Sequence, residues 1–116
     1  MGWYRFGEFE LDLELLELRR SGQALAMQPR VFDVLRHLVE HRGEVVTKTE
    51  RLEALWRDED VYDSVVAWSV SHIRRTLGQR GGRHPIETVS SGYRFTAEVV
   101  RGEAGVRERL ERGSAR

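Results

Sequence analysis

The sequence contains no cysteine, which excludes disulfide bonds and metal sites built from thiolate ligands. It also lacks an apolar run of the roughly 18 to 20 residues that a membrane-spanning helix needs. The first residues, MGWYRFGEFE, contain neither the basic segment nor the apolar segment of a signal peptide. From the last two absences we expect a cytoplasmic protein with no membrane segment in this chain.

Net charge is absent as well, because 19 Lys and Arg residues balance 19 Asp and Glu residues. A neutral chain is not a simple polyelectrolyte binder of nucleic acid. The charges are unevenly distributed, however: residues 1–60 contain nine basic and thirteen acidic side chains, whereas residues 61–97 contain five arginines and two acidic side chains. A local basic surface of this kind is typical of a small nucleic-acid-binding module, and a solvated mixed-charge surface explains it equally well.

With 116 residues, the chain has the length of one domain, and its first part has the pattern of a sheet. Apolar and polar side chains alternate through residues 3–27, and Ser21-Gly22 interrupts the alternation. This pattern predicts two or three antiparallel strands in a small sheet.

Helical spacing begins after this sheet. Pro29 suits the first turn of a helix, Gly43 suits the position after its end, and the apolar residues between them repeat at helical intervals: Phe32, Leu35, Leu38 and Val39. The residues EVV at 44–46 predict a short strand. Thr47 with Glu50 three residues later forms a capping-box pattern, which predicts a second helix that buries Leu52, Leu55 and Trp56.

A third helix, predicted over residues 62–77, is the most informative. Its apolar residues form one buried seam: Val66, Val70, Ile73 and Leu77. At roughly 100° per residue, the opposite side carries Ser64, Trp68, His72 and Arg75, with Val65 and Ser71 at its margins. A solvated helix face is usually rich in Glu, Lys and Arg, so this composition predicts a contact surface. The alternative is that Trp68 is covered by the N-terminal sheet or by a second chain.

Residues 84–97 predict a β-hairpin. Alternating residues give its strands one covered face: Ile86, Thr88, Tyr93 and Phe95. Ser90-Ser91-Gly92 suits a three-residue tip, with a type I turn closed by a left-handed glycine. Because an isolated two-stranded hairpin is only marginally stable in water, we expect this one to pack on another element.

Three motifs occur in order: RGEVVTKTERLEALW at 42–56, IRRTLG at 73–78 and IETVSSGYRF at 86–95. With them, residues 3–97 resemble the winged-helix effector domain of OmpR/PhoB-type response regulators and of the related ToxR/CadC-type regulators. The resemblance implies an α+β winged helix-turn-helix fold with an N-terminal antiparallel sheet, three helices and a C-terminal β-hairpin wing. It assigns residues 1–97 to a DNA-binding domain and leaves residues 98–116 as a charged tail or linker.

The same resemblance implies sequence-specific binding of double-stranded DNA by a bacterial transcriptional regulator that is not an enzyme and uses no cofactor. It implies that the helix over 62–77 enters the major groove and that the hairpin over 84–97 touches the adjacent backbone or minor groove. The positions that match DNA-contacting ones are Thr47, Lys48, Trp68, Ser69, Ser71, His72, Arg75, Thr88, Ser91 and Arg94. Arg74 lies nearer the seam, and we expect an internal ion pair for it with Glu50 or Glu53.

Protein partners are implied as well. In the resembled family, the loop before the third helix can touch RNA polymerase, and residues 57–61 match it with the acidic side chains of Asp58, Glu59 and Asp60. A solvated turn that caps the helix is the alternative for this loop. Ser71 and His72 stand where the family commonly has arginines, and the wing tip is short. We therefore expect either weak DNA binding by a monomer or binding that depends on a homodimer. The alternative function is a winged helix that contacts protein and has lost DNA binding.

A remote alternative is a zinc hydrolase. His37, Glu40 and His41 spell H-x-x-E-H, the inverted zincin pattern, with two imidazoles one helical turn apart and a glutamate between them. A catalytic zinc also needs a third protein ligand and a cleft. The three residues fall on the side of their helix away from the apolar stripe, as solvated residues do, and no metal is expected here.

Overall fold

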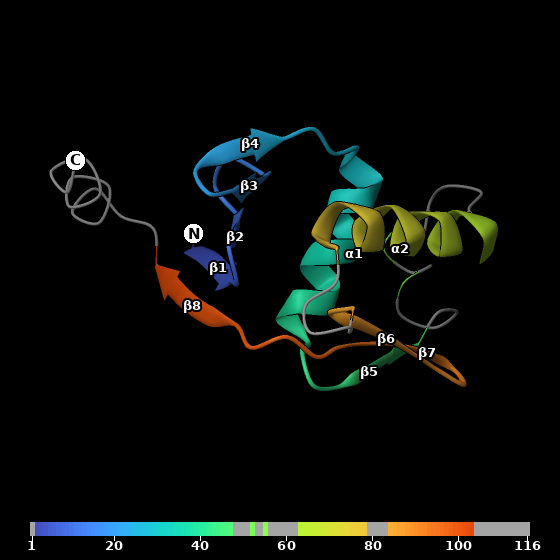
Figure 1. The fold of residues 1–116 in the computed structure, drawn as a ribbon. Helices are drawn as coiled ribbons and strands as arrows, with labels where there is room; N and C mark the ends of the chain where they lie inside the picture. Colours follow the sequence, from blue (N-terminus) through green and yellow to red (C-terminus); the bar gives the residue numbers. More distant parts are fainter. Residues whose placement is uncertain (1, 48–51, 53–54, 56–62, 79–83, 104–116) are drawn as a thin grey trace, which may run out of the picture. The chain divides into compact units, whose positions relative to one another are not determined.

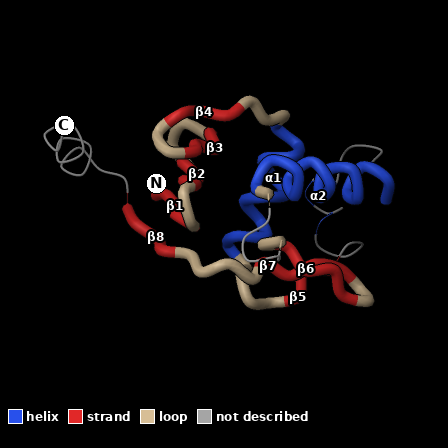
Figure 2. The backbone as a smooth tube through the Cα atoms, viewed as in Figure 1, coloured by secondary structure: helices blue, strands red, loops and turns tan. Residues whose placement is uncertain are grey.

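The computed structural model describes residues 2–47, 52, 55, 63–78 and 84–103 (Figures 1 and 2). The chain divides into two units, one made of residues 1–26 and 98–116 and the other of residues 27–97. In the described part, no helix is both long enough and apolar enough to cross a membrane.

The first unit contains a five-stranded antiparallel sheet in the order β4-β3-β2-β1-β8. Its strands are β1 Gly2–Phe6, β2 Phe9–Asp12, β3 Glu17–Arg20, β4 Gln23–Leu25 and β8 Val100–Glu103. The predicted antiparallel sheet is therefore present, but residues 3–27 contribute four strands rather than two or three. The additional hairpin forms because Ser21 and Gly22 both have positive φ, 49° and 87°, which closes a two-residue turn between β3 and β4.

Strand β8 was not predicted, since residues 98–116 were interpreted as a tail or linker. It pairs with β1 in the register Gly2↔Glu103 and Arg5↔Val100. Gly102 is required at this contact because a Cβ there would lie 2.1 Å from Cζ2 of Trp3. The tail interpretation is therefore wrong for Val100–Glu103, which are held by partners almost a hundred residues away and not by a local pattern.

The second unit contains two described helices and a three-stranded sheet. Its elements are α1 Pro29–Glu40, β5 Val45–Thr47, α2 Asp63–Leu77, β6 Ile86–Val89 and β7 Gly92–Phe95, and the strand order is β5-β7-β6. As predicted, Pro29 lies in the first turn of α1. The helix ends at Glu40 with His41 as its C-cap, so Gly43, which is left-handed (φ 84°), lies one residue beyond the predicted position. The Gly43 N–H donates to the Phe95 carbonyl oxygen at 2.9 Å, which connects the end of α1 to β7.

The core of this unit lies where α1 packs against α2 and against β7. The buried residues of α1 are Val31, Phe32, Val34, Leu35, Leu38 and Val39, so the predicted stripe is confirmed and is wider than predicted. The predicted short strand is also confirmed as β5. The second predicted helix falls mostly on residues outside the described part. Of its residues, only Leu52 and Leu55 are described, and Leu52 is fully buried.

Candidate nucleic-acid interface

Helix α2 has one buried side and one exposed side, as predicted. The predicted seam is buried, and it consists of Val66, Val70, Ile73 and Leu77. Ala67, Trp68, Ser71 and Arg75 are exposed, with His72 and Val65 partly covered. Ser64 belongs to the helix, but its side chain is outside the described part. We call Trp68, Ser71, His72 and Arg75 the exposed face of α2.

Trp68 is the largest side chain of this face. Its side chain is 49% exposed, which confirms the predicted outward orientation. Its ring stacks on the imidazole of His72, one helical turn away, with centroids 5.5 Å apart and planes inclined by 30°. The stacked imidazole thus supports the indole, which stays half exposed on the exterior of the second unit.

Ser69 does not belong to this face, although it was predicted to contact DNA. It is fully buried, and its hydroxyl donates to the Val65 carbonyl oxygen at 2.8 Å. The reason is helical phase: Ser69 lies three residues after Val66 and four before Ile73, on the buried seam. The assignment of Ser69 to the contact surface is therefore wrong.

Arg74 connects α2 to the hairpin. Its guanidinium donates to the Ile86 carbonyl oxygen from Nε (3.3 Å) and Nη2 (2.9 Å), and Nη2 also donates to Oγ1 of Thr88 at 2.6 Å. The guanidinium carbon lies 5.9 Å from the centroid of the Tyr93 ring. The acidic partners predicted for Arg74 were Glu50 and Glu53, which lie outside the described residues. The described contacts of Arg74 fix the helix to β6 and β7.

The predicted hairpin over residues 84–97 is present as β6 and β7, and its tip is shorter than predicted. Val89 pairs with Gly92, so only Ser90 and Ser91 form the turn, and both are exposed. The prediction of a left-handed Gly92 is wrong. Gly92 belongs to β7 and pairs with Thr47 of β5. A Cβ at this position would lie 2.0 Å from the Val46 carbonyl oxygen, so the close approach of β5 is what requires glycine.

The polar side chains of the hairpin already have partners inside the protein. Arg94 and Glu87 are directly opposite each other on β7 and β6, and their side chains form an ion pair. Oγ1 of Thr88 accepts from Arg74 and keeps its own hydrogen for donation to an external acceptor. Of the three hairpin residues predicted to contact DNA, Ser91 is exposed at the tip, Thr88 is exposed but shared with Arg74, and Arg94 is paired.

The remaining predicted positions are less favourable or are not described. Oγ1 of Thr47 is buried and has no hydrogen-bond partner among the described residues, so this hydroxyl is not exposed for the predicted phosphate contact. Lys48 and the acidic residues Asp58, Glu59 and Asp60 lie outside the described part of the chain. Among the described residues, the exposed side chains of the predicted set therefore lie on α2 and on the hairpin.

The H-x-x-E-H residues of α1 do come together. The rings of His37 and His41 have centroids 4.5 Å apart, as the spacing predicts. Glu40, however, accepts from Nε of Arg36 at 3.2 Å, and His41 Nδ1 lies 3.9 Å from Oε1 of Glu44. Among the described residues, no group of three or more His, Cys, Asp or Glu side chains is arranged to hold a metal ion.

Comparison with known proteins gives a family match over the second unit and part of the first. The model of the family described as "Transcriptional regulatory protein, C terminal" matches residues 22–95. Transcriptional activator CadC of Escherichia coli strain K12 is 30% identical over 99 residues, which cover 83% of this chain and 19% of that protein. Two-component response regulator PhoP of Pseudomonas aeruginosa is 34% identical over 92 residues, with 78% and 41% covered. The chain therefore spans about a fifth to two fifths of these relatives' length.

Solved structures show the same fold. The DNA-binding domain of E. coli CadC superposes with a TM-score of 0.73 at 28% identity, over 86% of this chain and 96% of that one. The DNA-binding domain of Klebsiella pneumoniae RstA, solved in complex with the RstA box, superposes with a TM-score of 0.67 at 26% identity, over 81% and 96%. Both neighbours are α+β winged-helix domains, which is the fold class predicted from the sequence.

Proposed function

Because this chain belongs to the family of transcriptional regulatory C-terminal domains, we propose that it binds double-stranded DNA in a sequence-specific manner as part of a transcriptional regulator. The family is one of DNA-binding regulatory domains and not of enzymes. The proposal includes a complete winged helix-turn-helix: a further helix after β5, α2 as the recognition helix and the β6–β7 hairpin as the wing. In this proposal the binding domain extends from residue 1 through strand β8, because β8 pairs with β1.

The observation that carries the proposal is the connection between α2 and the hairpin. A recognition helix and a wing contact one duplex together only if their relative orientation is fixed. Arg74 supplies this fixation, because one guanidinium binds the Ile86 carbonyl and the Thr88 hydroxyl at once. Helix α2 is thereby joined to β6 of the hairpin within one unit of the chain.

Each element has a distinct role in the proposed complex. Helix α2 enters the major groove with Trp68, Ser71, His72 and Arg75, and Arg75 is the side chain suited to a bidentate contact with guanine. The hairpin lies against the backbone or minor groove with Thr88, Ser91 and Arg94, and Lys48 adds a phosphate contact. The buried hydroxyl groups of Ser69 and Thr47 are not part of this set.

The charge distribution supports weak binding by a single copy. Of the three arginines described on α2 and the hairpin, Arg74 is bound to the hairpin and Arg94 is paired with Glu87, which leaves Arg75. Since phosphate neutralisation by cations supplies much of the affinity for DNA, we propose that a homodimer forms on DNA. We also propose contact with RNA polymerase through residues 57–61, and action in the cytoplasm, where bacterial DNA is located.

The test is binding to a pool of random duplexes, measured by fluorescence anisotropy across a salt series. We expect binding at low salt that weakens steeply between about 50 and 200 mM salt, because released counterions dominate the free energy. Selection from the same pool is expected to enrich a defined site. Absence of binding at low salt, or affinity that does not change with salt, would contradict the proposal and favour a protein-binding winged helix.

A further inference from the structure

A stacked aromatic pair occupies the position where a recognition helix meets base edges. From its exposure and its geometry we infer that the indole of Trp68, supported by its stacking on His72, is an apolar surface that reads the C5-methyl groups of thymine in the major groove. This inference rests on the proposed DNA-binding function and specifies which bases α2 recognises. The stacking of the two rings and the half-exposed indole are its starting points.

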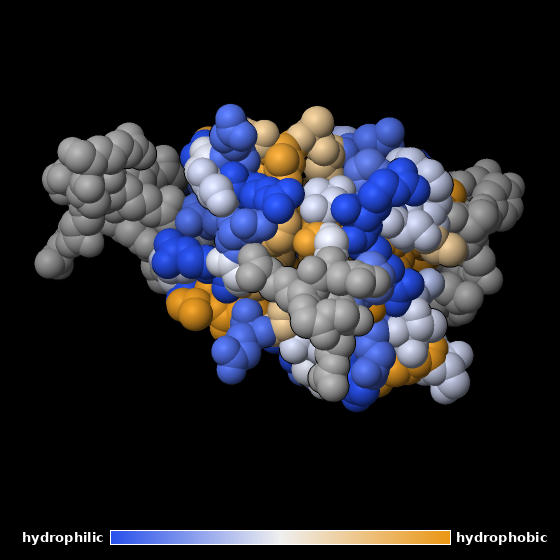
Figure 3. All heavy atoms as spheres, in the orientation of Figure 1, coloured by the Kyte–Doolittle hydropathy of each residue, from blue (hydrophilic) through white to orange (hydrophobic). Residues whose placement is uncertain are grey.

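Exposure alone does not single out Trp68. In the described residues, five large hydrophobic side chains are exposed: Leu15, Leu16, Val45, Trp68 and Val100. The space-filling view in Figure 3 shows hydrophobic residues as separate spots on a mainly hydrophilic surface. Trp68 differs from the other four because it lies on the exposed face of α2, one turn before His72 and about two turns before Arg75.

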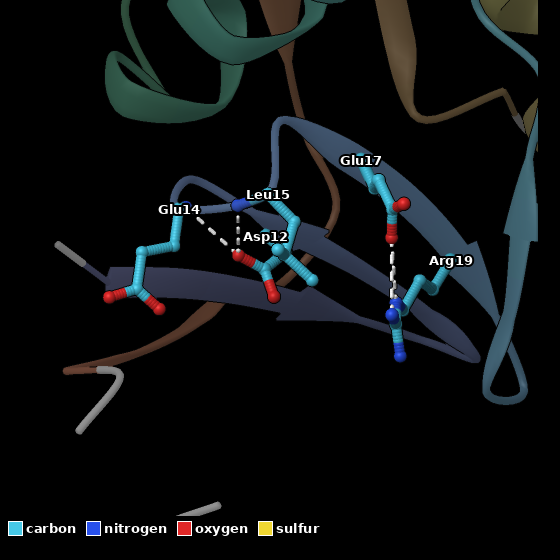
Figure 4. A network of polar contacts seen from close by, with 5 residues as sticks. All are labelled: Asp12, Glu14, Leu15, Glu17 and Arg19. Atoms are coloured by element: carbon cyan, nitrogen blue, oxygen red, sulfur yellow. Dashed lines mark hydrogen bonds and ion pairs between the residues drawn. The ribbon is translucent and has the colours of Figure 1, made fainter. Parts of the chain in front are cut away.

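Leu15 and Leu16 illustrate the difference. They lie in the turn between β2 and β3, where a carboxylate oxygen of Asp12 accepts from the N–H groups of Glu14 and Leu15 at 2.9 Å each (Figure 4). Their exposure follows from this turn, and nothing in the structure identifies a partner that covers them. Trp68, in contrast, is exposed within a proposed interface whose ligand is double-stranded DNA.

The geometry of the pair suits a flat apolar contact. Stacking on His72 restricts the rotation of the Trp68 side chain, so less conformational entropy is lost when the indole meets a ligand. The exposed neighbours Ala67 and Ser71 are small, and the indole therefore extends beyond them. In the major groove, the thymine methyl is the apolar group on a base edge, and apolar side chains recognise it.

The cations of α2 strengthen the inference by their distribution. Arg74 is bound to the hairpin, so Arg75 is the guanidinium that the described part of α2 presents on its exposed face. One guanidinium can read one guanine. The remaining contact area is aromatic, and the expected site therefore has thymine-containing steps beside a single G·C pair.

The decisive experiment removes the methyl group and leaves the Watson–Crick pair intact. The site selected by the wild-type protein is synthesised with deoxyuridine in place of each thymine in turn, and Kd is measured for the wild type and for Trp68→Ala. We expect one or two positions where the loss of the methyl weakens wild-type binding about threefold to fivefold. Trp68→Ala is expected to bind the thymine site correspondingly more weakly and to be insensitive to the same replacement.

Two controls separate this result from unrelated effects. Placing 5-methylcytosine or cytosine at the sensitive position, with guanine opposite, tests the methyl group on another base, and the methylated duplex is expected to bind about threefold tighter. Thermal unfolding of Trp68→Ala shows that the variant is folded, and Trp68→Phe is expected to restore part of the methyl sensitivity.

Failure of the inference is distinguishable from failure of the proposed function. If the wild type selects a defined site but binds its deoxyuridine versions equally well, the methyl-reading role is refuted while DNA binding stands. The same holds if wild type and Trp68→Ala lose equal affinity on the methyl-free site. If the wild type binds no duplex at low salt, both the proposed function and this inference are wrong, and an exposed Trp68 marks a protein contact.

Discussion

The exposed face of α2 and the β6–β7 hairpin belong to the same proposed interface, but they use their polar groups in opposite ways. On the hairpin, Arg94 is neutralised by Glu87, and Thr88 accepts a hydrogen bond from Arg74. On α2, Trp68 and Ser71 are exposed, and the described structure gives Arg75 no ion pair. The hairpin is thus held by internal contacts, whereas the helix keeps its groups for a ligand.

This difference implies a division of labour in DNA recognition. Contacts to phosphates position a protein on the duplex, and contacts to base edges specify the sequence. The hairpin, with paired charges and a serine tip, contributes position and little charge. Helix α2 contributes specificity through one arginine and an aromatic pair. Substitutions in the hairpin should therefore change stability or overall affinity, and those on the exposed face should change sequence preference.

The largest expected effect comes from the backbone contact that anchors the hairpin. In Gly92→Ala, the new Cβ would lie 2.0 Å from the Val46 carbonyl oxygen, which separates β5 from β7. We expect a loss of roughly 3 to 5 kcal/mol in the free energy of unfolding, in the range of severe core substitutions. Urea unfolding followed by circular dichroism measures it.

Gly43→Ala is the matched control for this prediction. Gly43 is left-handed, with φ 84°, but a Cβ there meets nothing within 4 Å. Only the backbone penalty remains, which we expect to be on the order of 1 kcal/mol. Equal losses in the two variants would show that conformation and not the approach of β5 explains Gly92.

A smaller effect is expected at Arg74, which joins the two regions. Arg74→Ala removes the hydrogen bonds to the Ile86 carbonyl and the Thr88 hydroxyl and should destabilise the domain by about 1 to 3 kcal/mol. DNA affinity should fall on all duplexes alike, because the hairpin loses its fixed orientation. Unfolding curves and Kd values on specific and random duplexes test both expectations.

The neighbouring residue provides the comparison for Arg74. Arg75→Ala should leave the free energy of unfolding within about 0.5 kcal/mol, since Arg75 is exposed. It should weaken binding to the preferred site by about 1 to 3 kcal/mol and flatten the preference at one base pair. If Arg75→Ala destabilised the fold and Arg74→Ala changed only sequence preference, the structural role proposed for Arg74 and the base contact proposed for Arg75 would both be wrong.

The sequence alone predicted the elements whose signals are local. Pro29 and Gly43 marked the limits of α1, and the spacing of Val66, Val70 and Ile73 identified the buried side of α2. The hairpin followed from alternation. The burial of Ser69 could have been predicted from the same helical phase. A serine hydroxyl is tolerated on the buried side because it can donate to a carbonyl oxygen of the preceding turn.

The features that were not predicted depend on contacts between distant residues. Gly92 was assigned to a left-handed turn because glycine is common there, but a strand more than forty residues earlier determines it. Strand β8 has no alternation of its own and is defined by β1. The hydrogen bonds from Arg74 to a main-chain carbonyl and a hydroxyl on β6 were not predicted either, and the predicted ion pair with Glu50 or Glu53 lies outside the described residues. Composition does not reveal such partners.

The smallest expected effect concerns the charge of the hairpin. Glu87→Gln removes the carboxylate that pairs with Arg94 and reduces repulsion of nearby phosphates. If the hairpin faces the DNA backbone, all duplexes should bind about twofold to fivefold more tightly, and the slope of log Kd against log salt should steepen by up to about one unit. Sequence preference should not change, because a phosphate contact carries no base information.

The double variant Glu87→Gln/Arg94→Ala should lose this gain in affinity, which would assign the gain to the released guanidinium of Arg94. Stability should change by less than about 1 kcal/mol, as is usual for an exposed ion pair. A gain confined to the preferred site would show that Arg94 reads bases, and the division between a positioning hairpin and a specifying helix would then be wrong.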